Sequence, residues 1–223
     1  MKLATVKHFV AESRILRLML GGSVVWELPK VTKSLILWSS TNFTVPQGIV
    51  SLKITMAGGG GGAAGSIGAV YIWGGGGGGG GGRVVKTFTP AELNEMRGKT
   101  FAVLVGAAGL YQGDNNWGGN GGTSQFQCPG LWPTAYGGNG GQTGSPGAGG
   151  AGSGGENGDE ILTGGNGGTG SVGGARGSGG HGQEVGDVAV AGTHGCGWGG
   201  GNGMPTGLNG AQGAVLIEWE AYE

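Results

Sequence analysis

Aromatic and acidic side chains are the residues of this sequence best suited to bind a partner. They stand in stretches that interrupt a long glycine-rich region between positions 58 and 213. Large rings give much contact area and lose little entropy on binding, and loops on a rigid scaffold are the usual place for recognition. The stretches are 67–73, 110–117, 123–136, 156–163, 181–194 and 204–208. The candidate binding residues are Tyr71, Trp73, Tyr111, Trp117, Phe126, Trp132, Tyr136, Glu156, Asp159, Glu184 and Asp187.

A structural role is the alternative for each of these rings. A glycine interior offers a ring no pocket, so some rings could cover the ends of a folded glycine region instead of contacting a partner. Trp198, which has glycines on both sides, is expected to be structural.

Two groups of residues contain types that can bind metals. Carboxylate oxygens suit Ca²⁺, whereas His and Cys suit Zn²⁺. Neither spacing matches a known cation loop or zinc pattern, so we expect a solvated acidic turn in the first case and no metal or other cofactor in either. The first group is Glu156, Asp159 and Glu160, and the second is His181, Glu184, Asp187, His194 and Cys196.

The sequence does not predict an enzyme. Matches to Gly-x-Gly-x-x-Gly are trivial in a chain with 62 glycines, and none follows a strand and opens a helix, as dinucleotide binding requires. The chain has no complete Gly-x-x-x-x-Gly-Lys-Ser/Thr phosphate-binding loop, and no nucleophile stands beside a base in any evident arrangement.

Charge and hydropathy exclude further classes of function. Only 11% of the 223 residues are charged and the net charge is −1, so the basic stripe that nucleic acid requires is absent. No apolar run approaches the length of about 20 residues that spans a bilayer, so we expect no membrane insertion. The N-terminus has no apolar core followed by a small-residue cleavage site, so we expect no signal peptide. Two cysteines, Cys128 and Cys196, are expected to be free thiols, although they could pair.

The glycines themselves have a period of three. All but three of the 62 glycines lie between 58 and 213, and five of them, 138, 141, 144, 147 and 150, are evenly spaced three residues apart. This period matches the polyproline II helix, which has three residues per turn and no internal hydrogen bonds. Its backbone groups must therefore pair with neighbouring helices, because a buried unpaired group costs about 1–3 kcal/mol. We predict a bundle of such helices packed backbone to backbone, with a disordered glycine linker as the alternative.

Ordinary strands flank the glycine region. Residues 50–56 alternate between apolar and polar, which is typical of a half-buried strand. Thr89 and Pro90, followed by Glu92, predict the start of a short helix that ends near Arg97. The predicted fold is mostly β with irregular segments and little α-helix: a small β-sheet module that carries a bundle of glycine-rich polyproline II helices. The flanking strands are expected at 43–57, 83–88, 100–105 and 214–219, a further strand at 34–38, and the glycine bundle at 58–82 and 106–213.

The first 41 residues are interpreted as an attachment segment, and residues 42–223 as one domain. Apolar residues at 14–20 and 24–28 flank a glycine turn and predict two paired strands; a helix over 6–20 is the alternative. Because the segment is too small to bury a core alone, we expect it to dock on the rest of the chain or on a partner. The candidate docking residues are Leu16, Leu18, Leu20, Val25 and Trp26.

Four stretches resemble phage tail proteins. Residues 43–48 with the following strand and 58–62 resemble the glycine-rich domain of many phage tail and fibre proteins, and 210–219 resembles its final strand. Residues 20–27 resemble an N-terminal segment common in phage tail proteins. The interrupted glycine block is similar to the tip adhesins of T-even-like long tail fibres, although the first 40 residues do not match the attachment part of those adhesins, so a siphophage-type tail tip is equally consistent.

The resemblance implies a function. In those adhesins polyproline II helices form a sandwich whose variable distal loops bind a bacterial outer-membrane protein. It therefore implies a receptor-binding protein at a phage tail or fibre tip, a protein receptor in preference to a glycan, and a second phage tail protein bound through the N-terminus. A structural tail or baseplate component with a glycine spacer is the alternative. An ice-binding protein ranks third, because the threonines do not form a regular face.

Overall fold

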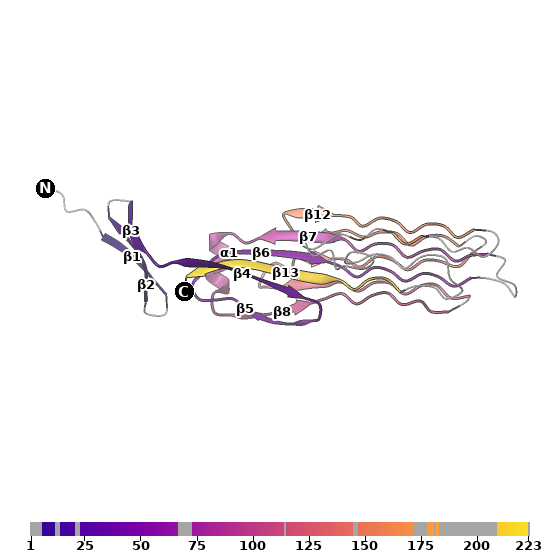
Figure 1. Ribbon diagram of the computed structural model, residues 1–223, viewed down its shortest axis with the longest axis horizontal. Helices are drawn as coiled ribbons and strands as arrows, with labels where there is room; N and C mark the ends of the chain where they lie inside the picture. The colour runs from indigo at the N-terminus through magenta and orange to yellow at the C-terminus, as the bar shows by residue number, and fades with distance from the viewer. Residues whose placement is uncertain are drawn as a thin grey trace.

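The computed structural model describes residues 6–11, 14–20, 23–66, 73–113, 115–144, 147–171, 178–180, 182 and 209–222. Along its long axis the molecule has three parts: a small N-terminal sheet, a β-sandwich, and a bundle of extended glycine segments (Figure 1). The C-terminus lies at the end of the sandwich that faces the N-terminal sheet, so the bundle projects away from both termini.

The N-terminal sheet has the antiparallel order β1-β2-β3. Strands β2 (Arg14–Leu20) and β3 (Ser23–Glu27) form the hairpin that the sequence predicts, and β1 (Val6–Ala11) pairs with β2 from Val6↔Leu20 to Ala11↔Arg14. The alternative of a helix over residues 6–20 is therefore wrong. These residues form strands because pairing among β1, β2 and β3 satisfies the backbone N–H and C=O groups that a helix would have paired internally.

Two five-stranded sheets form the sandwich. The first, which we call the β6 sheet, has the order β12-β7-β6-β13-β4; the second, the β9 sheet, has the order β11-β10-β9-β8-β5. The β6 sheet contains β4 (Lys30–Leu37), β6 (Ile49–Ala57), β7 (Arg83–Thr87), β12 (Glu160–Leu162) and β13 (Ala214–Tyr222). The β9 sheet contains β5 (Thr41–Thr44), β8 (Thr100–Leu104), β9 (Ser124–Gln127), β10 (Thr134–Ala135) and β11 (Gly155–Glu156).

The strands predicted beside the glycine region are confirmed as β4 to β8 and β13. Strands β9 to β12 were not predicted; they break the predicted bundle range 106–213 at residues 124–135 and 155–162. Strand β4 falls within the expected attachment segment, yet all eight of its residues pair with β13. This strand is part of the sandwich.

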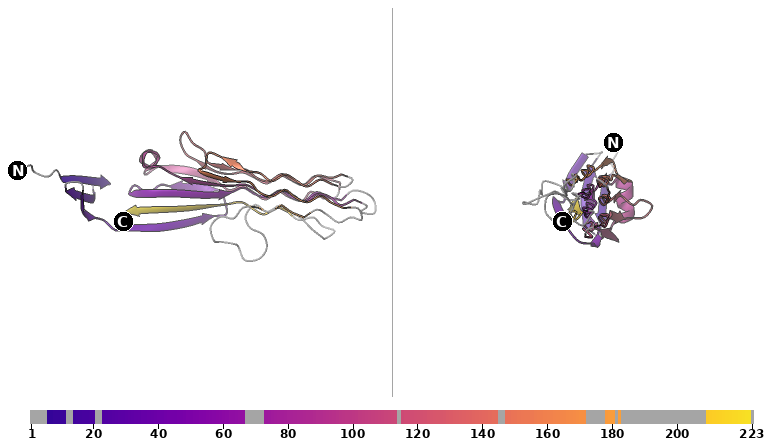
Figure 2. Two further views of the ribbon diagram at one scale, coloured as in Figure 1. Left: turned by 90° about the horizontal axis from the view of Figure 1, so that it is seen from above. Right: turned by 90° about the vertical axis from the view of Figure 1, so that its right-hand side faces the viewer.

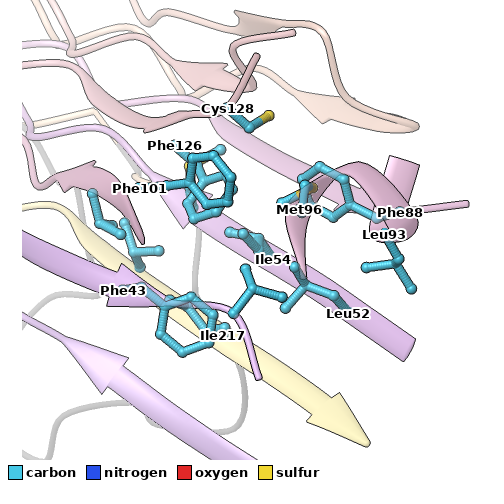
Figure 3. Close-up of a cluster of buried hydrophobic side chains, with 14 of the residues drawn as sticks. Phe43, Leu52, Ile54, Phe88, Leu93, Met96, Phe101, Phe126, Cys128 and Ile217 are labelled. Atoms are coloured by element: carbon cyan, nitrogen blue, oxygen red, sulfur yellow. The ribbon is translucent and has the colours of Figure 1, made fainter. Parts of the chain in front are cut away.

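The core lies between the two sheets (Figure 3). On β6, Leu52, Ile54 and Met56 are fully buried, as the alternation of apolar and polar residues predicts. Aromatic residues of the β9 sheet meet them from the other side, and Phe101 lies 5.7 Å from Phe126 between ring centroids. One continuous apolar core thus joins the two sheets.

Helix α1 (Pro90–Met96) closes this core beside β6. Its N-cap Thr89 forms the predicted capping box with Glu92: the Thr89 hydroxyl accepts from the Glu92 backbone N–H, and the Glu92 carboxylate accepts from the Thr89 N–H at 2.6 Å. Leu93 and Met96, three residues apart, are both buried.

Extended glycine segments, which we call rods, continue from the sandwich strands. Figure 2 shows them packed side by side in the end-on view. Rods 1 and 2 are the most enclosed, since every residue from 58 to 66 and from 74 to 82 is buried. The rods are rod 1 (58–66), rod 2 (74–82), rod 3 (106–113), rod 4 (117–123), rod 5 (137–144), rod 6 (147–154), rod 7 (163–171) and rod 8 (209–213).

Hydrogen bonds between the rods repeat every three residues. Successive N–H groups of rod 1 donate to rod 2, rod 4 and rod 8 in turn, and the cycle begins again at Gly61, which donates to Gly79 of rod 2 at 2.9 Å. The first three bonds join Gly58 to Gly82, Gly59 to Gly122 and Gly60 to Ala211, with N···O distances of 3.0, 2.9 and 2.8 Å. Three residues per turn is the geometry of polyproline II. The predicted bundle is confirmed, and for these residues the alternative of a disordered linker is wrong.

Close approach of the backbones explains why the rods need glycine. A Cβ atom placed on Gly61 would lie 2.0 Å from the carbonyl oxygen of Asn139, and one on Gly79 would lie 2.1 Å from that of Ala151. At these two positions no side chain fits between the backbones. Glycine is therefore required by space where the rods approach this closely.

Asparagine side chains satisfy backbone groups on the bundle surface. Asn120 Oδ1 accepts from the Gly140 N–H at 2.8 Å, and Asn166 Oδ1 accepts from the Gly152 N–H at 2.9 Å. Each bond joins two adjacent rods where no further rod lies outside them. The Gly-Asn-Gly-Gly pattern thus closes the outer layer.

Candidate functional site

The candidate binding residues fall on two separate surfaces and in the core. Rod 3 leaves the sandwich after β8 and rod 4 returns into β9, so the turn between them lies at the end of the bundle farthest from the sandwich. Strands β9 to β11 lie in the sandwich itself. We call the first location the distal end and the second the lateral surface.

At the distal end, the turn from rod 3 to rod 4 is fixed to the end of rod 1. The Asn115 N–H donates to the Ser66 carbonyl at 3.0 Å, and the Gly65 N–H donates to the Asn116 carbonyl at 2.9 Å. Within the turn, Gly113 and Asn115 adopt positive φ angles of 87° and 61°. Such a turn needs glycine or asparagine at these positions. Its backbone is held on both sides, so side chains next to it project from a rigid base.

The distal end carries the most exposed apolar side chains among the residues that the structure describes. Trp117 is 61% exposed and Leu110 is 58% exposed. These two residues lie near each other on adjacent rods, because the Gly119 N–H of rod 4 donates to the Leu110 carbonyl of rod 3 at 2.8 Å. Tyr111 and Trp73 are partly exposed, at the ends of rods 3 and 2. The structure thus brings three predicted residues to one end and adds Leu110, which the sequence signalled only as the first residue of an interruption.

The lateral surface carries Trp132, Tyr136 and Glu156. The loop between β9 and β10 presents Trp132, and its carbonyl accepts from Thr134 Oγ1 at 2.7 Å and from Asn157 Nδ2 at 3.1 Å. A side-chain hydrogen bond to Glu156 raises the pKa of Tyr136, so the phenol stays protonated and donates. Glu156 lies in β11, and Trp132 and Tyr136 flank β10, so these three residues belong to the β9 sheet and not to the distal end.

Phe126 was predicted to bind a partner, and this is wrong. Its side chain is 0% exposed and packs edge-on against Phe88, with ring centroids 5.8 Å apart. The cause is the strand β9, in which Ser124-Gln125-Phe126-Gln127 alternate, so that the ring points into the sandwich and the two amides point outwards. The sequence signal that could have shown this burial is the position of Phe126 between two polar residues, Gln125 and Gln127, as expected for the inward side of a half-buried strand.

Asp159 and Glu160, also named for binding or for a cation, are engaged in ion pairs. Asp159 accepts from the Thr87 N–H at 2.7 Å and from Lys86 Nζ at 3.3 Å, and Glu160 lies 3.4 Å from Arg83 Nη1. The backbone hydrogen bond from Thr87 holds the pKa of Asp159 below its usual range. These acids hold the β11–β12 turn against β7, which is a structural role.

The Lys86 ammonium is central to this network. Burial alone would lower its pKa, but the hydrogen bond to Asp159 and the charges of Glu92 and Asp159 outweigh burial and raise it. The hydrogen bond that Glu92 accepts from the Thr89 backbone lowers the Glu92 pKa in turn. At neutral pH all three groups are charged, so the ion pairs link β7, the β11–β12 turn and α1.

Cys128 is buried beneath the loop that carries Trp132. Its Sγ donates to the Leu131 carbonyl at 2.6 Å, and burial raises its pKa to about 11. A thiol with this pKa is almost entirely protonated at neutral pH and unreactive. Cys128 is a free thiol, and Cys196 lies outside the described residues.

Several predicted residues lie outside the part of the chain that the structure describes. These are Tyr71, Glu184 and Asp187 among the binding residues, and the whole group of His181, Glu184, Asp187, His194 and Cys196 considered for zinc. Among the described residues there is no group of three or more His, Cys, Asp or Glu that could hold a metal ion. None of the described helices is long and apolar enough to cross a membrane.

The sandwich and the bundle together form one recognised unit. The model of the glycine-rich domain family matches residues 37–220, which covers most of the chain. The chain belongs to this family. The match begins at the end of β4 and ends within β13, so it includes both the distal end and the lateral surface of the glycine-rich domain. No curated protein is similar enough to the chain to be matched.

The N-terminal sheet lies outside the matched glycine-rich domain. Of the candidate docking residues, Leu20 and Trp26 are each 45% exposed and Leu18 is partly exposed; the side chains of Leu16 and Val25 lie outside what the structure describes. The sheet connects with the sandwich through Glu27, which forms an ion pair with Lys30 at 3.3 Å and accepts a hydrogen bond from Tyr222. Its exposed apolar side chains make it a candidate attachment surface.

Proposed function

We propose that the protein is a receptor-binding protein at the tip of a phage tail or tail fibre, and that its distal end binds a bacterial outer-membrane protein. The observation that carries this proposal is the pair of exposed apolar side chains, Trp117 and Leu110, on the two rods joined by a turn that is fixed to the buried rod 1. A large ring on a rigid base loses little entropy when it enters a partner's pocket.

The position of this surface supports the proposal. The N-terminal sheet and the distal end lie at opposite ends of the molecule (Figure 1). A protein attached to a larger particle through the N-terminal sheet would present Trp117 outwards, where a receptor could reach it. No cofactor is needed, because recognition is by contact alone.

Chemistry at the distal end favours a protein over a charged polymer as the receptor. Leu110, Tyr111 and Trp117 are apolar or aromatic, and the described residues from 110 to 117 include no basic side chain. Such a surface gains affinity by removing apolar area from water, at about 25 cal/mol per Å². A folded protein surface with an apolar pocket meets that need.

The test is binding of the purified protein to a panel of intact Gram-negative strains before and after their surface proteins are removed with protease. We expect binding to at least one strain to be lost after protease treatment and to be about tenfold weaker for Trp117→Ala. Trp132→Ala is the matched control: it removes an exposed indole from the lateral surface and should leave the protease-sensitive binding unchanged. Protease-sensitive binding that Trp117→Ala does not weaken would contradict the proposal.

A structural tail or baseplate component is the second candidate, and the N-terminal sheet favours it. Leu20, Val24 and Trp26 expose apolar area that a docked partner would cover. In this case the glycine-rich domain would act as a spacer. A folded protein that binds no strain of the panel, but binds isolated tail particles through the N-terminal sheet, would support this candidate over the first.

A further inference from the structure

The outer face of the β9 sheet has a composition unlike that of the rest of the sandwich. Strands β5, β8, β9, β10 and β11 are fully described, and Glu156 is the only charged residue in them. By contrast, the outer face of the β6 sheet carries the ion pair between Lys53 and Glu218, 3.3 Å apart. A solvated sheet face usually resembles the second case, because charged side chains keep it soluble.

Side-chain amides and hydroxyls replace the charges on this face, and they form a connected row. Gln127 Nε2 donates to Gln125 Oε1 at 2.8 Å, Gln125 Nε2 donates to Thr134 Oγ1 at 3.1 Å, and Thr134 Oγ1 donates to the Trp132 carbonyl. Each group is thereby oriented before any ligand arrives. We call the surface formed by Gln125, Gln127, Trp132, Thr134, Tyr136 and Glu156 the amide face.

Two aromatic rings stand at either end of the β10 segment on this face. Trp132 is 52% exposed and Tyr136 is 40% exposed, while Thr134 between them is only 2% exposed although it points to the same side. Residues 132, 134 and 136 share one side because side chains alternate along an extended chain. The backbone positions of Trp132 and Tyr136 are about 13 Å apart, at about 3.3 Å per residue of extended chain.

Hydrogen bonds hold the backbone of Trp132 and the phenol of Tyr136. The carbonyl of Trp132 is bound by Thr134 and by the side chain of Asn157, and Pro133 follows it in the chain. The phenol of Tyr136 is held by Glu156, which lies across from Thr134 in the β10–β11 pairing. Glu156 accepts this hydrogen bond and still has acceptor capacity to spare, since a carboxylate has about four lone-pair sites.

From this arrangement we infer that the amide face is a second binding site and that its ligand is a neutral saccharide chain. Sugar hydroxyls both donate and accept hydrogen bonds, as the glutamine amides do. The C–H faces of sugar rings pack on aromatic rings, whose π faces are weakly negative. The separation of Trp132 and Tyr136 suits a chain of several sugar units, and the absence of basic residues disfavours an anionic one.

The inference goes beyond the proposed function, because it concerns a different surface and a different class of ligand. The distal end would contact a protein, and the amide face would contact the carbohydrate that surrounds it. The two sites share no residue. Each can therefore fail without the other.

The experiment is binding of the full-length protein to an array of purified bacterial surface saccharides, with neutral and anionic capsular polysaccharides and O-chains released from lipopolysaccharide. Neutral members that bind are then titrated in solution against the wild type, Trp132→Ala and Trp117→Ala. We expect at least one neutral saccharide to bind, its affinity to fall about tenfold or more for Trp132→Ala, and Trp117→Ala to bind like the wild type. Whether the protein binds O-chains or capsular polysaccharides identifies which of the two is the source of the ligand.

A second variant, Gln127→Ala, tests the row of amides without removing a ring. This variant keeps the hydrogen bond that Gln125 donates to Thr134. We expect it to weaken saccharide binding severalfold and to show the circular dichroism spectrum of the wild type. The inference is overturned if no neutral saccharide binds, if only anionic members bind, or if Trp132→Ala binds the same saccharides equally well. Loss of protease-sensitive cell binding in Trp132→Ala, without any saccharide binding, would assign the face to a protein partner.

Discussion

The sandwich and the bundle are both packed interiors, but they are filled in opposite ways. In the sandwich, side chains such as Ile54 and Phe126 fill the space between two sheets, and the backbones stay apart. In the bundle, the backbones of rods 1 and 2 lie in contact with their neighbours, and at positions such as Gly61 and Gly79 no side chain fits between them. The first interior is held by apolar burial, and the second by a network of hydrogen bonds.

This difference determines which substitutions each region tolerates. A side-chain core can lose a methyl group and relax partly around the gap. A backbone interior has no rotamers with which to adjust, so an added methyl group must separate two rods and break their hydrogen bonds. The two regions should therefore respond very differently to changes of the same size.

The largest effect is expected for Gly82→Ala, which adds one methyl group to rod 2. A Cβ atom at Gly82 would lie 2.1 Å from the Gly154 carbonyl oxygen, so we expect the free energy of unfolding to fall by about 3 kcal/mol or more. The control is Gly154→Ala on the facing rod, where the nearest atom, Thr163 Oγ1, is 3.3 Å away and can shift. Chemical denaturation measures both; equal effects at the two positions would refute the backbone-contact account.

A methyl group removed from the sandwich should cost less. Ile54→Val leaves a small gap in the core and should lower the free energy of unfolding by about 1 kcal/mol. The same denaturation experiment measures it. A loss as large as that of Gly82→Ala would show that the sandwich is as intolerant as the bundle.

A smaller effect again is expected at the surface of the bundle. Asn120→Ala removes the acceptor for the Gly140 N–H, and we expect a loss of about 0.5–1 kcal/mol, because water can replace part of this exposed bond. Hydrogen exchange of the Gly140 amide provides a local readout. Unchanged protection there would mean that the asparagine does not hold the outer layer.

The smallest effect is expected in the ion pairs that join the turn at 157–159 to the sandwich. Asp159→Asn keeps an acceptor for the Thr87 N–H but loses the charge near Lys86, and should cost about 0.5 kcal/mol at pH 7 because the carboxylate is half exposed.

Acid should remove this difference. The pKa of Asp159 is lowered in the folded state, so its contribution is present above the ordinary value of 3.8 and is lost as the pH falls through the lower folded value. The stabilities of the wild type and Asp159→Asn should therefore converge in that range. A difference that persists below it would have another cause.

Much of the fold could be predicted from the sequence, because two strong periodicities were present. The alternation at 50–56 gave β6, and the three-residue glycine period gave the rods, since each period corresponds to one backbone geometry. Strands β10 and β11 have two residues each, which is too short for any period to appear. They exist because their neighbours in the sheet supply the hydrogen bonds.

The candidate site was predicted less completely, because sequence shows where rings occur but not on which side they lie. Trp117 and Phe126 both stood in interruptions of the glycine region, yet one is at the distal end and the other is in the core. The split between the distal end and the lateral surface depends on the direction of each rod. That direction is set by the sheets to which the rods return.

The threefold cycle of hydrogen bonds in rod 1 also constrains how such a domain can change over evolutionary time. One residue inserted into a rod would turn all that follows by a third of a turn and direct each N–H group towards the wrong neighbour. Rods can therefore lengthen only in steps of three, and only together with the rods beside them. The turns do not have to keep this period of three residues, so their length and sequence can diverge between relatives while the bundle beneath them stays the same.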